Sequence, residues 1–144
     1  MELINTIGEH GPLITLIYGF ITIIKRPIYL TGYLVFTGIN QAINVLLKSI
    51  IKEPRPEPNG KTDYDQHGMP SGHAQHIFFF ITFTYLVNKS VMVLFIELFL
   101  SFITLYQRWK YKKHTISQLI VGSLLGIIIA YFSVEAIRIY LKNI

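Results

Sequence analysis

The 144-residue sequence has no cysteine and few charged residues, and each shortage narrows the class of protein. Without cysteine the chain can form no disulfide and no thiolate metal site. Charged residues make up 15% of the chain, whereas a water-soluble domain ordinarily carries about 25%. Hydrophobic residues make up 51%, and they come in blocks separated by short polar or basic stretches. This pattern is typical of a protein that crosses a membrane several times.

The apolar blocks predict an all-α, polytopic transmembrane bundle of about five helices, in a single membrane-embedded domain over residues 1–144. The expected helices cover residues 12–25, 28–52, 71–88, 91–107 and 115–141. The first is short for a hydrocarbon core about 30 Å thick, so the apolar stretch 3–7 either extends it or lies at the interface. Residues 53–70 are rich in proline and polar side chains, which predicts an extended loop outside the bilayer.

The net charge of +5 comes from basic residues in the connectors between the apolar blocks. A nucleic-acid-binding surface is therefore a poor interpretation, and basic flanks with an anion site fit better. Five helices place the 53–70 loop and the 107–114 connector on one side of the membrane, and the Lys25-Arg26 connector on the other. Both sides are basic, so the positive-inside rule is ambiguous. We expect the loop side to be non-cytoplasmic, with cations that serve an anionic ligand.

Polar residues inside the apolar blocks need partners, because an unpaired polar group in lipid is costly. We expect the amides of Asn40, Gln41 and Asn44 to bond to neighbouring helices. Glu135 and Arg138 should pair, since they lie three residues apart on a helix. Gly122 and Gly126 form a small-residue motif that favours close helix packing, and Glu97 has no evident partner.

Three polar clusters are expected to meet on the loop side, each where a helix reaches the membrane surface. They are Lys48 with Arg55-Pro56, then Pro70-Ser71-Gly72-His73, then Arg108 with His114 and Gln118. Arginine offers a planar fork to phosphate oxygens and lysine adds a point charge. The backbone N–H groups of Ser71 and Gly72, at a helix start, would bind an anion. The set predicts phosphoryl transfer in which one histidine attacks phosphorus and the other protonates the leaving oxygen.

These clusters resemble the tripartite signature of the type-2 phosphatidic acid phosphatase (PAP2) superfamily. That signature is a lysine six residues before Arg-Pro, then Pro-Ser-Gly-His, then Ser-Arg followed by a histidine and an aspartate. The resemblance implies that His114 is the nucleophile, which forms a phosphohistidine, and that His73 is the general acid. It further implies a phosphate-binding set and no metal or other cofactor. The set comprises Lys48, Arg55, Ser71, Gly72 and Arg108.

Two positions depart from the superfamily pattern. Gln107 stands where the family has serine, and Gln118 where it has the aspartate that orients the nucleophile. Glutamine at the second position resembles the dolichyldiphosphatase branch, as do the segments 51–56 and 68–75. On a helix the Gln118 carbonyl could accept from one ring nitrogen of His114 and fix its tautomer. An amide stabilises an imidazolium less than a carboxylate does, so we expect a working but less activated nucleophile.

The branch resemblance implies a lipid phosphatase that hydrolyses dolichyl or another polyisoprenyl diphosphate to the monophosphate, in the endoplasmic reticulum membrane, for protein N-glycosylation. The expected partner is therefore a membrane lipid. A broader lipid phosphatase, acting on phosphatidic acid or undecaprenyl diphosphate, is the enzyme alternative. A catalytically inactive lipid-phosphate binder or a small membrane scaffold is the alternative from another class.

A metal site is the remaining alternative, and the local charge disfavours it. Its candidate ligands would be His67, His73, His76 and His114 with Asp63 and Asp65. The surrounding lysines and arginines would repel a cation, so the same residues fit an anion better.

Overall fold

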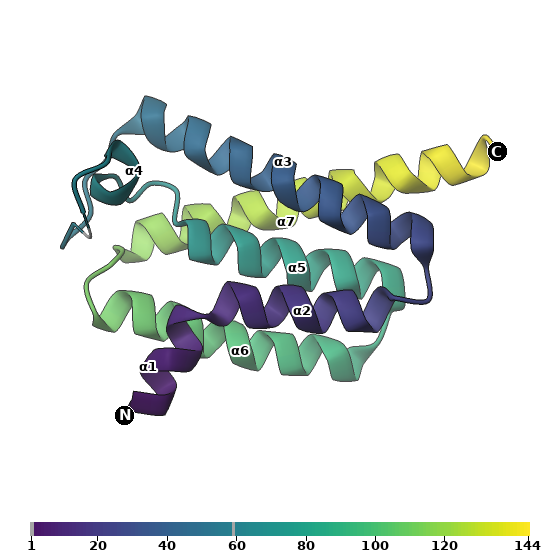
Figure 1. Cartoon of the computed structure of the whole chain (residues 1–144), viewed down its shortest axis with the longest axis horizontal. Helices are drawn as coiled ribbons and strands as arrows, with labels where there is room; N and C mark the ends of the chain where they lie inside the picture. The colour runs from purple at the N-terminus through teal and green to yellow at the C-terminus, as the bar shows by residue number, and fades with distance from the viewer. Residues whose placement is uncertain (1, 59) are drawn as a thin grey trace.

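The computed structural model describes residues 2–58 and 60–144, and these residues form an all-α bundle (Figure 1). The helices in this part of the chain are α1 (Glu2–Glu9), α2 (Gly11–Ile23), α3 (Pro27–Ile51), α4 (Asp63–Gln66), α5 (Gly72–Asn88), α6 (Val91–Lys110) and α7 (Ile116–Lys142). The five long helices are those expected from the sequence, and the fold class is confirmed. The additional helices, α1 and α4, are short. The apolar stretch 3–7 forms α1, separate from α2, because Pro12 starts a new helix.

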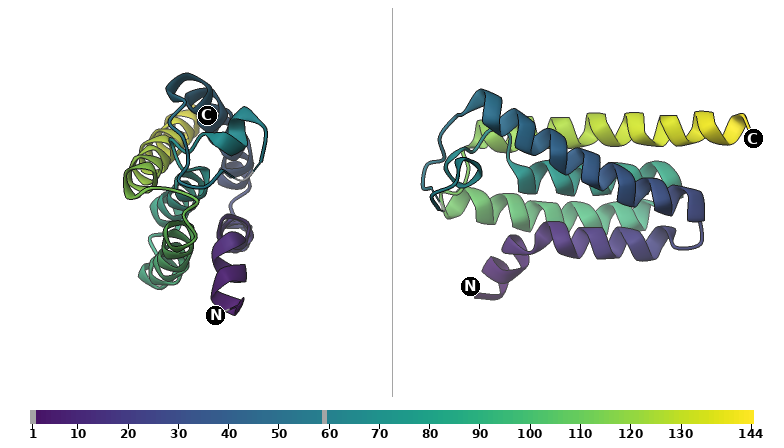
Figure 2. Two further views of the ribbon diagram at one scale, coloured as in Figure 1. Left: turned by 90° about the vertical axis from the view of Figure 1, so that its left-hand side faces the viewer. Right: turned by 45° about the horizontal axis from the view of Figure 1, so that its top comes forward.

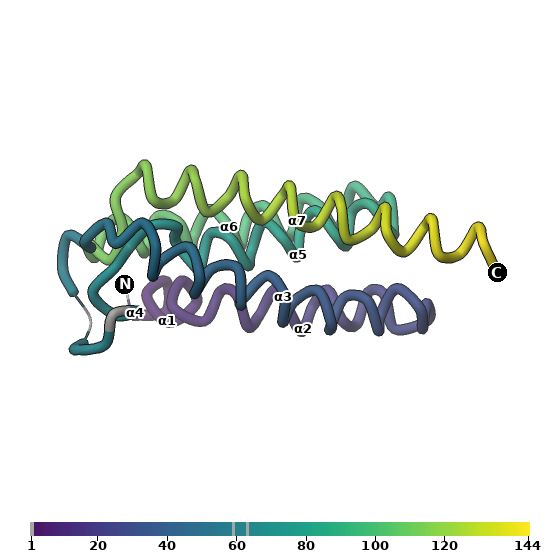
Figure 3. Tube along the Cα trace, turned by 90° about the horizontal axis from the view of Figure 1, so that it is seen from above, coloured from purple at the N-terminus to yellow at the C-terminus, as the bar shows by residue number. Residues whose placement is uncertain are grey.

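The long helices form two layers, visible from the end and from above (Figures 2 and 3). One layer contains α5, α6 and α7, and the other contains α2 and α3. Helix α5 is the central element, because it packs against α2, α3, α6 and α7. Its aromatic residues Phe79, Phe80 and Phe83 are fully buried around Tyr33 of α3, with ring centroids 5.2–6.3 Å from that of Tyr33. Aromatic burial on this scale anchors the two layers to each other.

In the part of the chain that the structure describes, three helices are long and apolar enough to cross a membrane: α3, α6 and α7. Large apolar side chains on their outer faces point away from the protein, for example Leu34, Phe99 and Phe132, which are 50%, 66% and 67% exposed. Such surfaces are stable against lipid and unstable against water. Together they identify a multi-pass integral membrane protein. Helix α2 has 13 residues, about 20 Å at the usual rise, and does not span the hydrocarbon core alone.

Helices α5 and α7 approach most closely at the two glycines of α7. A Cβ atom on Gly122 would lie 2.5 Å from the backbone oxygen of Ser71, and one on Gly126 would lie 2.1 Å from that of Gln75. Because neither position has room for a side chain, the backbones of the two helices can meet here. The predicted packing role of this motif is confirmed.

Other polar residues of the spans form the inter-helix bonds that lipid burial demands. Asn44 donates to Gln75 Oε1 at 2.8 Å, and Gln75 donates to Asn40 Oδ1 at 2.8 Å, which ties α3 to α5. Gln41 is exposed instead, so its expected role was wrong. Glu97 accepts a 2.6 Å hydrogen bond from Thr84 Oγ1. The predicted pair of Glu135 and Arg138 forms.

The two ends of the bundle differ in content. The end that we call the motif end holds the 52–71 loop with α4 and the 111–115 connector, and α1 also lies toward it (Figure 1). The opposite end, the connector end, holds the short turns 24–26 and 89–90 and the C-terminal residues 143–144 (Figure 1). All three polar clusters of the sequence therefore lie at one end of the molecule.

Candidate active site

Three cationic side chains are buried at the motif end. Lys48, in the last turn of α3, is 2% exposed, Arg55 is 8% exposed and Arg108, near the end of α6, is 6% exposed. Lys48 Nζ and Arg55 Nε both donate to the backbone oxygen of His67, each at 3.1 Å. Lysine and arginine are rarely buried to this extent without a carboxylate partner. Their burial therefore concentrates positive charge in a small volume.

Among the described side chains, which exclude that of Asp63, none of these three cations forms an ion pair with a carboxylate. Arg108 Nε is buried and has no hydrogen-bond partner among the same residues. Burial lowers the pKa of Arg55, while Tyr64 and Asp65 oppose the shift. A buried cation that lacks a counter-charge is costly, so this arrangement favours binding of an anion.

The start of α5 lies beside these cations. Ser71 is the N-cap residue, and its hydroxyl accepts from Ala74 N at 3.4 Å. The Ser71 N–H donates to the backbone oxygen of Gln118 at 3.1 Å, so it is not directed at a ligand as the sequence led us to expect. The N–H groups of Gly72 and His73 precede the internal hydrogen bonds of the helix and remain suited to an anion.

His114 is 2% exposed and lies between α6 and α7. Its Nδ1 is 3.2 Å from Gln118 Oε1, and that oxygen also accepts from Thr115 N at 3.2 Å. The Gln118 amide nitrogen donates to the Pro54 backbone oxygen at 2.9 Å. A backbone N–H can only donate and a carbonyl can only accept, so the amide oxygen must face His114. Nδ1 of His114 therefore carries a proton, and Nε2 is left with its lone pair.

The electrostatic surroundings keep His114 uncharged. Burial is the largest cause that lowers its pKa, and the positive charges of Arg55, Lys48 and Arg108 add to it. The hydrogen bond to Gln118 acts in the opposite direction, and the pKa falls from 6.5 to about 2. A neutral imidazole is the form that can attack phosphorus.

His73 lies in the first turn of α5 and contacts α1. Its Nε2 is 3.0 Å from the backbone oxygen of Glu9, an acceptor, so this nitrogen carries a proton. This contact could not be predicted from the residue types, because any residue can supply a backbone carbonyl. Tyr64 was also missed: its ring lies 5.1 Å from Lys48 Nζ, and a Cβ on Gly72 would be 3.0 Å from its hydroxyl.

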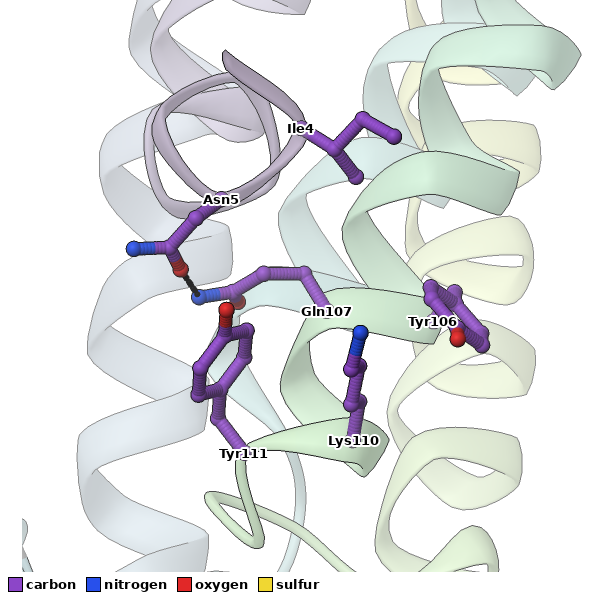
Figure 4. Close-up of a pocket in the computed structure, with 6 residues that line it drawn as sticks. All are labelled: Ile4, Asn5, Tyr106, Gln107, Lys110 and Tyr111. Atoms are coloured by element: carbon purple, nitrogen blue, oxygen red, sulfur yellow. Dashed lines mark hydrogen bonds between the residues drawn. The ribbon is translucent and has the colours of Figure 1, made fainter. Parts of the chain in front are cut away.

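Gln107, at the position where the superfamily has serine, faces away from the cations toward α1. Its amide nitrogen donates to Asn5 Oδ1 at 2.7 Å. Figure 4 shows it lining a cavity of about 230 Å³ between α1 and α6, together with Ile4, Tyr106, Lys110 and Tyr111. Its side chain therefore attaches α1 to the bundle, where the family's serine would face a phosphate.

A second cavity, of about 450 Å³, opens beside His114. It is bounded by Pro56, Lys112, Trp109 and Ile116, so it combines a cation with exposed apolar side chains. Among the side chains that the structure describes, which exclude that of Asp63, no group of three acidic or histidine residues could hold a metal. His67 contributes its backbone oxygen to the site.

Fold and site together define a multi-pass membrane protein with a cluster of buried cations and a histidine at one end of its helix bundle. The chain belongs to the PAP2 superfamily, whose family model matches residues 29–140.

Several known proteins are similar to this chain. Dolichyldiphosphatase 1 of Homo sapiens is 30% identical in an alignment 129 positions long that covers 76% of this chain and 54% of that protein. Lipid phosphate phosphatase gamma of Arabidopsis thaliana is 32% identical in an alignment 101 positions long that covers 61% of this chain and 44% of that protein. The chain thus spans about half the length of the curated relatives it matches.

The fold has a solved counterpart. The crystal structure of a transmembrane PAP2-type phosphatidylglycerolphosphate phosphatase from Bacillus subtilis superposes with a TM-score of 0.72 at 19% identity. The match covers 99% of this chain and 77% of the bacterial one. The two chains therefore share a fold over essentially the whole of this protein.

Proposed function

We propose that this chain is a lipid phosphate or pyrophosphate phosphatase that works through a phosphohistidine on His114. One observation carries the proposal: a neutral, oriented histidine lies among three buried cations that have no carboxylate partner in the described chain. Such a site compensates the negative charge of a phosphoryl group and offers it a nucleophile. Membership of the PAP2 superfamily agrees with this chemistry.

In the proposed first step, His114 Nε2 forms a bond to phosphorus as the bond between phosphorus and the lipid oxygen breaks. The leaving oxygen takes its proton from Nδ1 of His73 in its imidazolium form, while the proton on Nε2 stays with the Glu9 oxygen. Water then attacks the phosphohistidine, with His73 now accepting a proton, which releases phosphate and free His114. Lys48, Arg55, Arg108 and the N–H groups of Gly72 and His73 at the start of α5 hold the phosphoryl oxygens, and Gln118 fixes the tautomer of His114. No cofactor takes part in this scheme.

The proposed substrate is dolichyl or another polyisoprenyl diphosphate, hydrolysed to the monophosphate. Dolichyldiphosphatase relatives support it, and so does the presence of several cations for two phosphoryl groups. The cavity beside His114 supports a lipid substrate more generally, because Trp109 and Ile116 provide apolar surface next to Lys112. Its tail would lie in the bilayer against the exposed apolar faces of the helices.

We further propose that residues 1–144 form one phosphatase domain whose motif end faces the non-cytoplasmic side, as in the endoplasmic reticulum lumen. The connector end carries Lys25, Arg26, Lys89 and Lys142, and the positive-inside rule assigns such residues to the cytoplasm. The cations of the motif end are excluded from this count because they serve the ligand.

Phosphate release by the purified protein tests the proposal. We expect polyisoprenyl diphosphate to be hydrolysed with a higher kcat/KM than phosphatidic acid. A tenfold preference for phosphatidic acid, about 1.4 kcal/mol of transition-state stabilisation, would reject the substrate and keep the reaction. Lipid-phosphate binding with no release from any of these lipids would instead favour the inactive binder.

A further inference from the structure

The Gln118 amide connects the proposed nucleophile to a carboxylate. Its oxygen accepts from His114 Nδ1, as described above, and its nitrogen donates to Glu53 Oε1 at 2.8 Å. The three side chains thus form a chain from Glu53 through Gln118 to His114. The orientation of the amide does not depend on Glu53, because Thr115 N and the Pro54 oxygen already determine it.

The hydrogen-bonded side chains of Glu53, Gln118 and His114 are held in place by the 52–71 loop and by the start of α7. The backbone oxygen of Glu53 accepts from Gly68 N at 2.7 Å. A Cβ atom on Gly68 would lie 2.2 Å from Gln118 Oε1, so the 52–71 loop closes directly over the amide. Gln118 is fully buried, and Thr115 and Gln118 form a capping box at the start of α7. The Gln118 amide that Glu53 contacts is therefore held in one orientation.

A negative charge near the nucleophile would favour the proposed first step. When His114 Nε2 bonds to phosphorus, Nδ1 keeps its proton and the ring becomes cationic. The positive charges of Arg55, Lys48 and Arg108 disfavour a cationic ring at this position. A neutral amide offers a dipole, whereas a carboxylate hydrogen-bonded to the amide nitrogen polarises it and makes its oxygen a stronger acceptor.

We propose that Glu53 is a positioning residue that acts through Gln118. Its carboxylate places a negative charge on the far side of the Gln118 amide from the cation that develops on His114. In this chain the hydrogen-bonded pair of Glu53 and Gln118 does what a single carboxylate in direct contact with the histidine could do. The inference rests on the proposed function, because it concerns the same nucleophile. It assigns a catalytic purpose to a residue outside the three polar clusters.

The substitution Glu53→Gln tests this inference, because glutamine keeps the shape and can still accept from the Gln118 amide. We expect kcat, and the rate constant for phosphoenzyme formation in rapid quench, to fall about 10- to 100-fold, with KM changed less than about threefold. Glu57→Gln is the matched control. Glu57 lies on the same loop and pairs with Lys112 at 3.8 Å, and its side chain is 59% exposed. The control removes the same charge and should leave kcat unchanged.

A swapped pair separates charge from structure. In the double variant Glu53→Gln with Gln118→Asp, the carboxylate faces His114 directly and the amide stands at position 53. Aspartate is one methylene shorter than glutamate, which draws its second oxygen back from the Pro54 oxygen that accepts from the Gln118 amide. We expect turnover to return to within about threefold of the wild type. A Glu53→Gln rate equal to that of Glu57→Gln would overturn the inference. So would a slow Glu53→Gln whose rate the swap leaves unchanged, because Glu53 would then be a structural contact alone.

Two further outcomes are distinguishable from these. Should Glu53→Gln fail to reach the membrane, the swapped pair decides, since it keeps one amide and one carboxylate: turnover within threefold supports the inference, and a loss above tenfold rejects it. Turnover of lipid phosphate by the wild-type protein without any phosphoenzyme would contradict the proposed function itself, and with it the proposed role of Glu53.

Discussion

The two ends of α5 both attract arginine, and they use it differently. At the connector end, Arg26 donates to the backbone oxygen of Val87 at 2.6 Å, and Arg138 donates to that of Leu86 at 3.0 Å. Cations at a helix C-terminus satisfy its last carbonyls and match the negative end of the helix dipole. At the motif end, Arg55 and Arg108 lie near the positive end of the same dipole. The arginines at the connector end thus stabilise the helix, whereas the charges of Arg55 and Arg108 interact unfavourably with its dipole.

This difference between the arginines indicates which end of the molecule is suited to bind a ligand. Arg138 also pairs with Glu135, so its charge is compensated inside the protein. Arg108 forms no ion pair with a carboxylate among the described side chains, and its buried Nε has no hydrogen-bond partner there, so a bound anion would compensate its charge. Energetically unfavourable placement of charge at one end, beside favourable placement at the other, is typical of a binding site rather than of a stabilising network.

The largest effect at the motif end should come from removal of the proposed nucleophile. His114→Ala should abolish turnover and the phosphohistidine, while binding of lipid phosphate stays within a few-fold because all three cations remain. Rapid quench with ³²P-labelled substrate, followed by analysis of alkali-stable phosphohistidine, measures the first effect, and equilibrium binding measures the second. Turnover above a small fraction of the wild type would contradict the role of His114 and the mechanism with it.

His73 should give the next largest effect. His73→Ala removes the general acid, which is typically worth about 10²- to 10⁴-fold in rate. The loss should be greatest for lipids with poor leaving groups and small for activated aryl phosphates, whose leaving oxygen needs no proton. Single-turnover rates across a series of leaving groups measure this, and an equal loss for every ester would argue against proton transfer by His73.

Arginine substitutions at the two ends compare them directly. Arg108→Gln should lower kcat/KM about 10²- to 10³-fold, because it removes a charged donor to the transition state. Arg138→Gln should leave kcat/KM unchanged and lower the free energy of unfolding by about 1 kcal/mol, through loss of its contacts with Leu86 and Glu135. Kinetics and thermal unfolding in the same detergent supply both numbers. A stability loss for Arg108→Gln that exceeds that for Arg138→Gln would reverse the interpretation of the two ends.

Chelation of metal ions tests, without any substitution, whether the site at the motif end needs a metal. Activity should persist in EDTA, because the proposed site compensates phosphate charge with Lys48, Arg55 and Arg108. Phosphate release measured with and without EDTA, and after addition of Mg²⁺ or Zn²⁺, tests it. Complete loss in EDTA that added metal restores would require a metal in the mechanism.

The smallest perturbation addresses the orientation of the two ends. The chain has no cysteine, so a single one can be labelled without background. Position 59, a natural choice from the sequence, lies outside the described residues, whereas Lys61 is exposed at the motif end and Lys25 is exposed at the connector end. In sealed vesicles of known orientation, an impermeant thiol reagent should label Lys61→Cys from the non-cytoplasmic side and Lys25→Cys from the cytoplasmic side. The reverse pattern would refute the topology.

The long helices could be predicted from the sequence because lipid requires continuous apolar stretches, and their boundaries agree within a few residues. Helix α6 ends at Lys110, three residues beyond the expected end, because long basic side chains can extend to the interface. The central place of α5 was not evident from its sequence. It follows from the glycines of α7, which let one neighbour approach so closely that α5 loses contact with lipid on that side.

Much of the site's second layer could not be predicted, because it consists of contacts without a residue signature. The backbone oxygens of His67 and Glu9 contact Lys48, Arg55 and His73, and any residue type could supply them. The contact of His114 with Gln118 was predictable from the four-residue spacing. The contact of Gln118 with Glu53 was not, since 65 residues separate them and only the folded loop brings them together.

The close approach at Gly122 and Gly126 has a consequence for how sequence variation in this protein should be interpreted. Ser71 and Gln118 meet at the membrane surface because α5 and α7 touch backbone to backbone one and two turns deeper in the lipid. An alanine at either glycine would push the helices apart and disturb His114 without altering any residue that a substrate touches. In a genetic screen for inactive variants that still reach the membrane, these glycines should therefore recur beside the histidines.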